Sequence, residues 1–410
     1  MKTPAADHPG LGMELAKVIG IGSSSGHLML SQLEDHLIAA ADREQVLKEW
    51  QAYMGTTRNQ GSLPAATWPG GRLTEVEALM CRQLYYALVV STIGVLYLQR
   101  GGGLSPGSIE PDLIINTLLM PVKSPTAGPS GASAGGETMP FGSLAEVLPP
   151  ITATLASILR DLDFSRHATG DLFRPLYENL IPARVRHRMG EHYTPEWLAM
   201  HILDQVGYDG QAESTLIDPA CGSGVFLVEA LRRKTAQSPK TCRDRTIVGM
   251  DVNPLAVLAA RVNYMMALGQ RGGEDAALKL EEIPVYLGDV LLGDEDGLWR
   301  VDTLPFAHEK FDLVVGNPPW VNWESLSPEY RLATLALWKR YGLFSHSGMD
   351  TILGSGKKDL STLVTLSSAS QFLKPGGKMA YLITQSVFKS GGAAEGFRDF
   401  RLPGGGQIGR

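Results

Sequence analysis

Polar side chains stand at or beside the ends of four successive apolar, strand-like runs in the second half of the chain. These residues are Asp218, Asp251, Asp289 and Asn317, and their runs are 215–218, 246–252, 283–289 and 311–317. Each residue alone has a structural explanation, because Asp and Asn are good helix N-caps and turn formers. Four in succession favour one shared ligand-binding edge.

A glycine-rich turn follows the first of these carboxylates. In the segment DPACGSG, at 218–224, Gly222 and Gly224 permit a tight turn, and a helical pattern opens at about Val225. Such a turn lets backbone N–H groups approach a ligand closely. The dinucleotide fingerprint would place a third glycine where Leu227 stands, which disfavours a nicotinamide cofactor.

The fourth run ends in an unusual tetrapeptide, Asn317-Pro318-Pro319-Trp320. Two prolines stop the strand, remove two backbone donors and fix φ twice. An amide side chain and a large aromatic ring are therefore held in a fixed relation. A Pro-Pro turn beside a core tryptophan is the purely structural alternative.

The elements that position these residues alternate between strand and helix. A further strand-like run lies at 378–384, and helical patterns separate the runs. This alternation predicts an α/β fold with a doubly wound parallel sheet, in which ligands bind at the carboxyl ends of the strands. Residues 1–120 read as mainly helical.

Composition narrows the class of protein. The 410 residues carry a formal net charge of −6, so any contact with DNA must come from local patches. Three cysteines without metal-ligand spacing suit a reducing cytoplasm, and no metal site is predicted. The N-terminus lacks the apolar core of a signal peptide. The apolar stretch at 84–98 is shorter than a membrane span, which predicts a buried helix and no membrane contact.

Changes of composition divide the chain into four predicted parts. They are a helical N-terminal domain at 1–120, a Pro/Gly/Ser/Ala-rich linker at 121–143, a helical segment at 144–205, and an α/β domain at 206–410. The role of residues 1–150 is not indicated by any motif.

These motifs in this order resemble the S-adenosylmethionine-dependent DNA adenine-N6 methyltransferases of restriction–modification systems. The carriers are DPACGSG, the Asp251 run, Gly288-Asp289, NPPW and a preceding Gly-x-x-Tyr-Thr-Pro element at 190–195. The order resembles the gamma arrangement and the large type IIG or Eco57I-like branch. The resemblance covers about residues 165–400 and implies a class I methyltransferase domain with a Rossmann-like sheet.

The resemblance implies a binding site for S-adenosyl-L-methionine. Tyr193, Thr194 and Pro195 would line its methionine end, and the loop of Asp218, Pro219, Ala220, Gly222 and Gly224 would wrap that moiety. Asp251 would hold the ribose with Val252 beside the adenine ring, and Asp289 would accept from the adenine amino group with Val290 alongside. Cys221 is interpreted as a packing residue.

The resemblance also implies a role for NPPW. The Asn317 side-chain oxygen and the Pro318 carbonyl would accept both hydrogens of the target amine, with Pro319 helping to hold them in place. Trp320 would stack on an adenine flipped out of double-stranded DNA. The product would be N6-methyladenine in a restriction–modification or related defence system.

Several alternatives stay open. NPP-aromatic motifs also occur in methyltransferases that act on protein glutamine or ribosomal guanine. Basic residues at 184–188 and 232–245 could meet phosphates, although charged runs are more often solvated. The last residues follow the fifth run closely, which predicts C-terminal truncation. The chain would then be a non-catalytic cofactor-binding remnant, or would be completed by a downstream polypeptide carrying a target-recognition domain. Neither a recognition sequence nor a nuclease signature is evident.

Overall fold

The structure is a computed structural model that describes residues 11–54, 73–100, 146–162, 170–237, 246–269, 280–292, 310–343, 359–389 and 393–403, and positions 114, 144, 406 and 409. The predicted linker at 121–143 lies outside these residues. The α-helices are α1 (Leu11–Ile19), α2 (Ser24–Ala39), α3 (Arg43–Tyr53), α4 (Glu75–Arg100), α6 (Leu148–Leu159), α7 (Arg174–Leu180), α8 (Ala183–Met189), α9 (Glu196–Val206), α10 (Val225–Gln237), α11 (Pro254–Gly269), α12 (Pro328–Arg340), α14 (Leu360–Phe372), α15 (Ser386–Lys389) and α16 (Ala393–Arg398).

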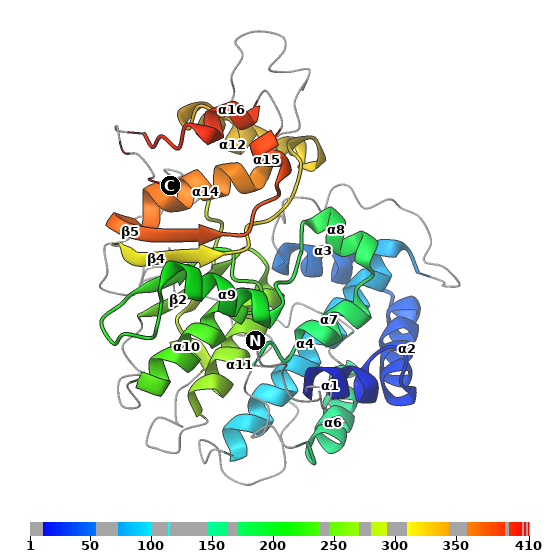
Figure 1. The fold of residues 1–410 in the computed structure, drawn as a ribbon. Coiled ribbons are helices and arrows are strands. Elements are labelled where there is room, and N and C mark those ends of the chain that lie inside the picture. Colours follow the sequence, from blue (N-terminus) through cyan, green and yellow to red (C-terminus); the bar gives the residue numbers. More distant parts are fainter. Residues whose placement is uncertain are drawn as a thin grey trace, which may run out of the picture.

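Five parallel strands form one sheet (Figure 1). They are β1 (Leu216–Asp218), β2 (Ile247–Asp251), β3 (Val285–Leu287), β4 (Phe311–Gly316) and β5 (Leu373–Tyr381). Their spatial order is β3-β2-β1-β4-β5. The strand order reverses between β1 and β4, which is where open α/β sheets bind ligands. The predicted α/β class with a doubly wound parallel sheet is confirmed.

The fifth strand differs from its predicted bounds. It begins at Leu373, which pairs with Phe311, and an irregularity follows before Leu313 pairs with Lys378. The intervening Pro-Gly-Gly sequence at 375–377 breaks the register, because proline donates no ladder hydrogen bond. The apolar run at 378–384 therefore marks only the second part of β5.

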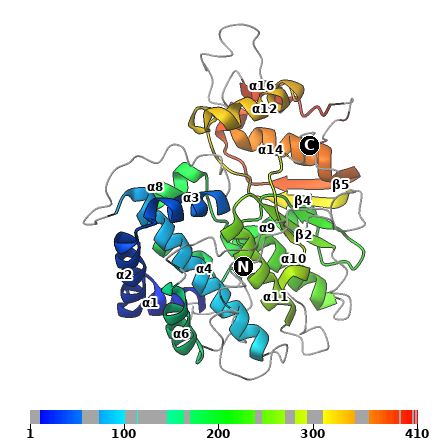
Figure 2. The same cartoon turned by 180° about the vertical axis from the view of Figure 1, so that it is seen from behind.

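Alternation along the strands divides the interior into two cores. Leu216 and Leu313 point into a core that also contains residues of α9, α10 and α11. Ile217 and Val314 point to the other face, where residues of α12 and α14 pack. Successive side chains of a strand face opposite sides of the sheet, so both faces are buried, as parallel sheets require. Figure 2 shows the sheet between these helical layers from behind.

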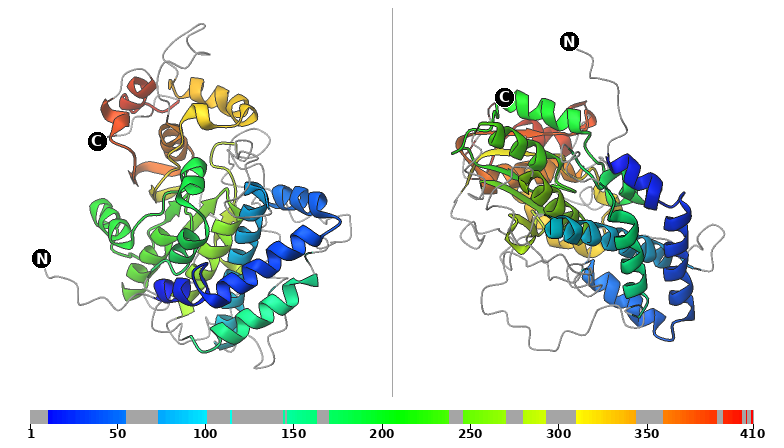
Figure 3. Two further views of the ribbon diagram at one scale, coloured as in Figure 1. Left: turned by 90° about the vertical axis from the view of Figure 1, so that its right-hand side faces the viewer. Right: turned by 90° about the horizontal axis from the view of Figure 1, so that it is seen from below.

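The N-terminal helices pack directly against the α/β part. Helix α4 lies beside α11, and their side chains belong to one continuous hydrophobic core (Figures 1 and 3). Glu75 at the start of α4 lies 2.9 Å from Arg184 and 3.6 Å from Arg188 of α8. The basic run at 184–188 is thus paired with carboxylates of the same chain. The division into domains stays a prediction, but the described N-terminal helices share a core with the sheet.

Helix α4 is the element that contains the most apolar stretch of the sequence. By length and composition it could cross a membrane, yet its most apolar 18-residue window is entirely buried inside the protein. Polar partners fit a core position: Tyr85 Oη donates to the Ile19 carbonyl at 2.8 Å, and Arg82 donates to the Leu180 carbonyl at 2.9 Å. The predicted buried helix is confirmed.

The contact between α4 and α11 can be tested at Gly94. A Cβ at this position would lie 3.1 Å from Cγ2 of Val262, which is tighter than ordinary van der Waals contact. We expect Gly94→Leu to lower the free energy of unfolding by about 1–3 kcal/mol, because a packed interface must separate to admit the side chain. Urea denaturation followed by circular dichroism measures the change.

Ser91→Ala is the matched control on the same helix. Ser91 is fully buried, and its hydroxyl has no hydrogen-bond partner among the described residues. We expect its removal to leave stability unchanged or slightly raised. Equal stability of Gly94→Leu and the wild type would contradict a close α4–α11 interface.

Candidate active site

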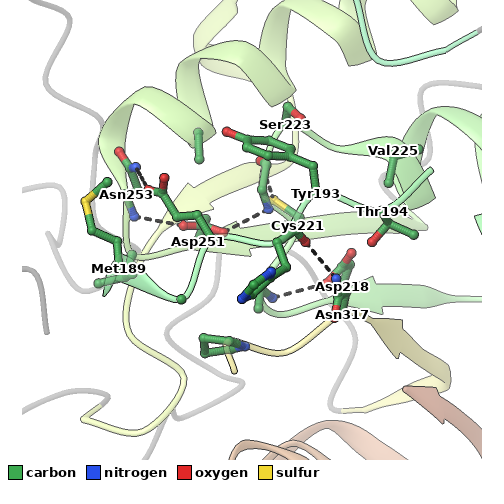
Figure 4. A pocket seen from close by; sticks show the side chains of 18 of the residues that line it. Met189, Tyr193, Thr194, Asp218, Cys221, Ser223, Val225, Asp251, Asn253 and Asn317 are labelled. Atoms are coloured by element: carbon green, nitrogen blue, oxygen red, sulfur yellow. Dashed lines mark hydrogen bonds between the residues drawn. The ribbon is translucent and has the colours of Figure 1, made fainter. Parts of the chain in front are cut away.

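A pocket opens at the carboxyl ends of β1, β2 and β4 (Figure 4). Four segments distant in sequence supply most of its lining: the segment 189–194, the glycine-rich loop, the end of β2 and the start of NPPW. The predicted site residues in its lining are Tyr193, Thr194, Asp218, Pro219, Ala220, Gly222, Asp251, Val252, Asn317 and Pro319. Those outside its lining are Pro195, Gly224, Asp289, Val290, Pro318 and Trp320.

Backbone conformation shapes the glycine-rich loop. Gly222 has φ 54° and Gly224 has φ 90°, a left-handed region that other residues rarely adopt. A Cβ at Gly224 would lie 3.2 Å from Cβ of Ala260, so the loop packs closely on α11. A Cβ at Gly222 would meet nothing within 4 Å, which leaves room for a ligand beside the backbone.

Asp251 ties the end of β2 to this loop. Its Oδ2 accepts from the Gly222 N–H at 2.8 Å, and its Oδ1 accepts from the Asn253 N–H at 2.9 Å. Figure 4 shows its carboxylate between the two segments. A carboxylate oxygen can accept more than one hydrogen bond, so Asp251 is also a suitable acceptor for a ligand hydroxyl.

Asp218 is a buried carboxylate at the centre of the sheet. It is 1% exposed, and its Oδ1 accepts from the Ala220 N–H at 3.1 Å. Burial raises the pKa of Asp218 well above its usual value, and the neighbouring Asp251 adds to the effect. A Cβ at Gly316 would lie 2.5 Å from Asp218 Oδ1, so a glycine is required for β4 to approach this carboxylate.

The two polar atoms of the Asn317 amide differ in their hydrogen bonding. Its Nδ2 donates to the His192 carbonyl at 2.7 Å, whereas its Oδ1 is buried with no hydrogen-bond partner among the described residues. A buried acceptor without a partner costs free energy, and such groups in folded proteins call for an explanation. The amide oxygen is available to a donor brought by a ligand.

The segments 189–194 and NPPW lie directly against each other. Gly190 ends α8 with φ 71°, and a Cβ there would lie 2.2 Å from Cγ2 of Val321. A side chain at 190 would therefore push NPPW away from the pocket. This contact, with the Asn317–His192 hydrogen bond, sets the position of Asn317.

Trp320 sits behind the pocket wall. Its Nε1 donates at 3.1 Å to the carbonyl of Leu382, the residue directly after β5, which fixes the ring at the end of that strand. The His192 imidazole stacks on it, with ring centroids 5.0 Å apart and planes at 28°. Burial lowers the pKa of His192, and His187 and Arg186 add to this effect, which favours the neutral form of the stacked ring. Pro318 is buried beside it.

Asp289 and Val290 follow β3 and have partners of their own. Asp289 Oδ1 accepts from the Leu291 N–H at 2.8 Å, and its Oδ2 accepts from Tyr330 Oη of α12 at 2.9 Å. Val290 is 1% exposed and belongs to the second core. The residues predicted for the adenine end of a cofactor are thus at the same sheet edge but outside the pocket lining.

Glu191 is a pocket residue that the sequence analysis did not single out. Its Oε2 accepts from Tyr177 Oη at 2.9 Å, and its Oε1 accepts from Asn253 Nδ2 at 3.0 Å. Burial raises the pKa of Glu191 to about 7 against the opposing effect of these hydrogen bonds. Glu191 occupies the first x of the Gly-x-x-Tyr-Thr-Pro element. Its place in that element was the sequence signal that could have indicated it.

Two further residues were missed because they lie far away in the sequence. Asp171 accepts from Ser223 Oγ and from Asn263 Nδ2, at 3.0 Å for the latter, and so anchors the glycine-rich loop. Met54, just after α3, lines the pocket from the N-terminal helices. Neither stands in a motif, and only folding brings them to the site.

Cys221 lies in the loop but is a packing residue. It is 5% exposed, and burial raises the pKa of its thiol well above the usual value, with Asp251 and Asp218 contributing. A thiol that stays protonated is a poor nucleophile. Across the residues that the structure describes, no group of three or more His, Cys, Asp or Glu side chains could hold a metal ion.

Comparisons with known proteins bear on this site. The family described as N-6 DNA Methylase matches residues 166–400. A stretch of 173 residues is 27% identical to the type I restriction enzyme MjaVII methylase subunit of Methanocaldococcus jannaschii and covers 42% of this chain and 26% of that protein. Another, of 221 residues, is 30% identical to the adenine-specific methyltransferase PglX of Streptomyces coelicolor and covers 42% of this chain and 18% of that protein. The chain spans about a quarter or less of the length of these relatives.

Two solved structures share the fold. The DrdV–DNA complex aligns with a TM-score of 0.52 at 16% identity, over 91% of this chain and 36% of that one. The type ISP restriction–modification enzyme LlaBIII bound to DNA aligns with a TM-score of 0.51 at 13% identity, over 96% of this chain and 26% of that one.

The raised pKa of Glu191 predicts a pH-dependent stability. The folded protein holds the Glu191 proton up to about pH 7, whereas the unfolded chain releases it near 4.5. The free energy of unfolding therefore falls as pH rises through this window. Between pH 4.5 and pH 8, we expect the free energy of unfolding of Glu191→Gln to rise by up to about 3 kcal/mol relative to that of the wild type. Urea unfolding at both pH values measures this.

Glu213→Gln serves as the control, because Glu213 is an exposed carboxylate. The free energy of unfolding of the Glu213→Gln variant should depend on pH as that of the wild type does. If Glu191→Gln also keeps the wild-type slope, Glu191 does not titrate in the predicted window.

Proposed function

Because the chain belongs to the N-6 DNA methylase family, whose model matches residues 166–400, we propose that it methylates adenine N6 in DNA with S-adenosyl-L-methionine as methyl donor. The activity would serve a restriction–modification or related defence system. Double-stranded DNA with a flipped adenine is the proposed substrate.

The observation that carries this proposal is the unpartnered oxygen of Asn317. Its Nδ2 is held by the His192 carbonyl, so the amide cannot turn over without losing that bond. The buried Oδ1 therefore presents an acceptor that none of the described residues satisfies. A planar NH2 group supplies a suitable donor.

The pocket suits a cofactor with a ribose and a charged amino acid end. Asp251 can accept from ribose hydroxyls, and the open space beside Gly222 lets backbone N–H groups approach. Asp218 would face the ammonium group, with Tyr193 and Thr194 at the methionine end and Val252 beside the adenine ring. Pro195, Asp289 and Val290 are assigned to the same cofactor by resemblance. When bound, the cofactor supplies a sulfonium methyl group.

Catalysis would rest on preorganised acceptors. The amine of adenine is a poor nucleophile because its lone pair is delocalised into the ring. Asn317 Oδ1 and the Pro318 carbonyl would accept both amine hydrogens and favour a more tetrahedral nitrogen. The two prolines keep these acceptors in fixed relation, so no reorganisation is needed as charge develops. The methylated cation then loses its proton to an acceptor or to water.

Trp320 would provide the stacking surface for the target base. The indole ring is fixed by its hydrogen bond to Leu382, and one of its faces is covered by His192. A flipped adenine would use the other face or replace the imidazole. Base–aromatic stacking is worth about 1–3 kcal/mol per base.

Further proposals concern the protein's partner, its place of action and two alternative functions. A separate polypeptide carrying a target-recognition domain is the proposed protein partner, which fits the naming of one relative as a methylase subunit. The cytoplasm is the proposed place of action. Methylation of protein glutamine or ribosomal guanine is the alternative activity, since both targets are planar NH2 groups, and a non-catalytic cofactor-binding remnant is the second alternative.

Asp251→Ala tests the cofactor assignment. The change removes hydrogen bonds to ribose hydroxyls and the acceptor of the Gly222 N–H. We expect the binding free energy for S-adenosyl-L-methionine to weaken by about 2–4 kcal/mol. Titration calorimetry measures the affinity, with a thermal melt as the folding control. Unchanged affinity would remove Asp251 from the site.

Asn317→Ala and Trp320→Ala separate chemistry from base capture. We expect Asn317→Ala to abolish turnover while leaving cofactor affinity largely intact, because Asn317 engages the target amine. Trp320→Ala should weaken base capture by about 1–3 kcal/mol and spare the chemical step more. Single-turnover methylation with labelled cofactor, beside calorimetry, gives both quantities.

The substrate class is tested by offering DNA, ribosomal RNA and a release factor together with labelled cofactor. Label on adenine N6 of DNA supports the proposal. Label on glutamine or guanine would replace it with the alternative activity. Cofactor binding without transfer to any substrate, with the recognition polypeptide supplied, would favour the remnant.

A further inference from the structure

Three carboxylates share the pocket, and one of them has a distinct environment. Glu191, Asp218 and Asp251 all line it. Asp218 accepts the backbone N–H of Ala220 in its own loop, and Asp251 accepts the backbone N–H groups of Gly222 and Asn253. Glu191 instead accepts from two side chains of different elements, Tyr177 of α7 and Asn253 after β2. Its charge state is therefore coupled to both the helical and the sheet parts of the protein.

The hydrogen bonds of Glu191 favour its ionised form. Both carboxylate oxygens face donors, Tyr177 Oη at 2.9 Å and Asn253 Nδ2 at 3.0 Å. A protonated carboxyl group would need an acceptor for its own hydrogen, and Asn253 Nδ2 cannot serve as one. Asn253 is itself held, because its Oδ1 accepts from the Leu255 N–H at 2.9 Å and its own N–H donates to Asp251.

The surroundings of Glu191 favour its neutral form. Burial opposes the charge, and Asp251 adds a like charge from the end of β2. Among the described residues, the other titratable groups that interact with it are Tyr177 of α7, Tyr86 of α4, the nearby Tyr193 and the cationic Arg186 of α8. These opposing effects place the pKa of Glu191 at about 7. The group is then about half protonated at neutral pH.

We propose that Glu191 discriminates the sulfonium cofactor from its neutral thioether product, by losing a proton to solvent when the cation binds and regaining it when the thioether remains. This inference rests on the proposed function of the same pocket. The donors around Glu191 are already placed for the carboxylate, so an added positive charge decides the balance without rearrangement. The carboxyl hydrogen passes to buffer as H⁺, and one negative charge is left in the pocket.

The charge state of Glu191 would affect how readily the thioether product leaves the pocket. A pocket in which Glu191 is ionised holds a cation better than a neutral molecule of nearly the same shape, because the carboxylate attracts the cation. S-adenosylhomocysteine differs from S-adenosyl-L-methionine by the methyl group and the sulfonium charge. Protonation of Glu191 after methyl transfer would remove the unbalanced charge that the product cannot neutralise.

Proton release is measured by titration calorimetry in buffers of different ionisation enthalpy. The full chain is titrated at pH 7 with S-adenosyl-L-methionine and, separately, with S-adenosylhomocysteine. We expect about half a proton to be released per sulfonium cofactor bound, and close to none for the thioether. The thioether is the matched ligand control, because it shares the ribose, the base and the amino acid end.

Three variants identify the source of the proton. Glu191→Gln should bind the cofactor without proton release, and its preference for sulfonium over thioether should shrink severalfold. Glu196→Gln is the matched control, because Glu196 follows on the same segment but pairs with Arg232 at 3.4 Å and lies outside this pocket. It should release protons as the wild type does.

Tyr177→Phe tests the mechanism by shifting the pKa of Glu191 while the carboxyl group stays in place. The phenol donates to Glu191 and lowers its pKa, so its removal raises the pKa. The pH of greatest proton release should therefore move upward, with Glu191 still present. This variant keeps the experiment informative if Glu191→Gln is poorly folded.

Distinct outcomes overturn the proposal. Cofactor binding without buffer-dependent heat would overturn it and leave the proposed function intact. Wild-type proton release from Glu191→Gln would assign the proton to another carboxyl group, such as Asp218. Equal proton release with both ligands would deny any role to the sulfonium charge. No binding of either ligand would overturn the proposed cofactor and this inference together.

Discussion

The hydrogen bond from the Asn317 amide to the His192 carbonyl is the interaction on which the candidate site depends. It joins the segment before α9 to the turn after β4, and so fixes an amide oxygen that has no hydrogen-bond partner among the described residues. The close contact between Gly190 and Val321 supports the same junction. A site that uses preorganised acceptors needs such a junction, because an amide that rotates freely can turn its oxygen toward another hydrogen-bond donor.

The same short segment lines the side of the pocket that is proposed for the cofactor. Glu191, next to His192, reaches Tyr177 on one side and Asn253 on the other. Asn253 in turn positions Asp251 through its backbone N–H. Changes on the cofactor side are thus only one residue away from the group that holds Asn317. This proximity explains how one segment can contact both halves of a group-transfer site.

The N-terminal helices form part of the site's support. Tyr177 packs edge-to-face with Tyr86 of α4 at 4.9 Å and with Tyr193 of the pocket at 5.5 Å. Met54 reaches the pocket lining itself. Because α4 is buried along its most apolar window, these aromatic contacts are supported by a helix of the protein core. The helical region therefore positions pocket residues as well as filling space beside the sheet.

Local patterns predicted the alternation of strands and helices and part of the pocket lining. Strand–helix alternation predicted the parallel sheet, because periodicity is set by neighbouring residues, and Asp251 and Asn317 stand where strand ends must gather at one edge. The sequence could not indicate that Asp289 accepts from Tyr330, that Trp320 lies behind His192, or that Glu191 is shared by two distant donors. These facts depend on which segments become neighbours after folding. Residue types and spacing determined what could bind at the sheet edge, and tertiary packing alone decided the burial, partners and charge of each group, because desolvation and hydrogen bonding arise only between segments brought together in space.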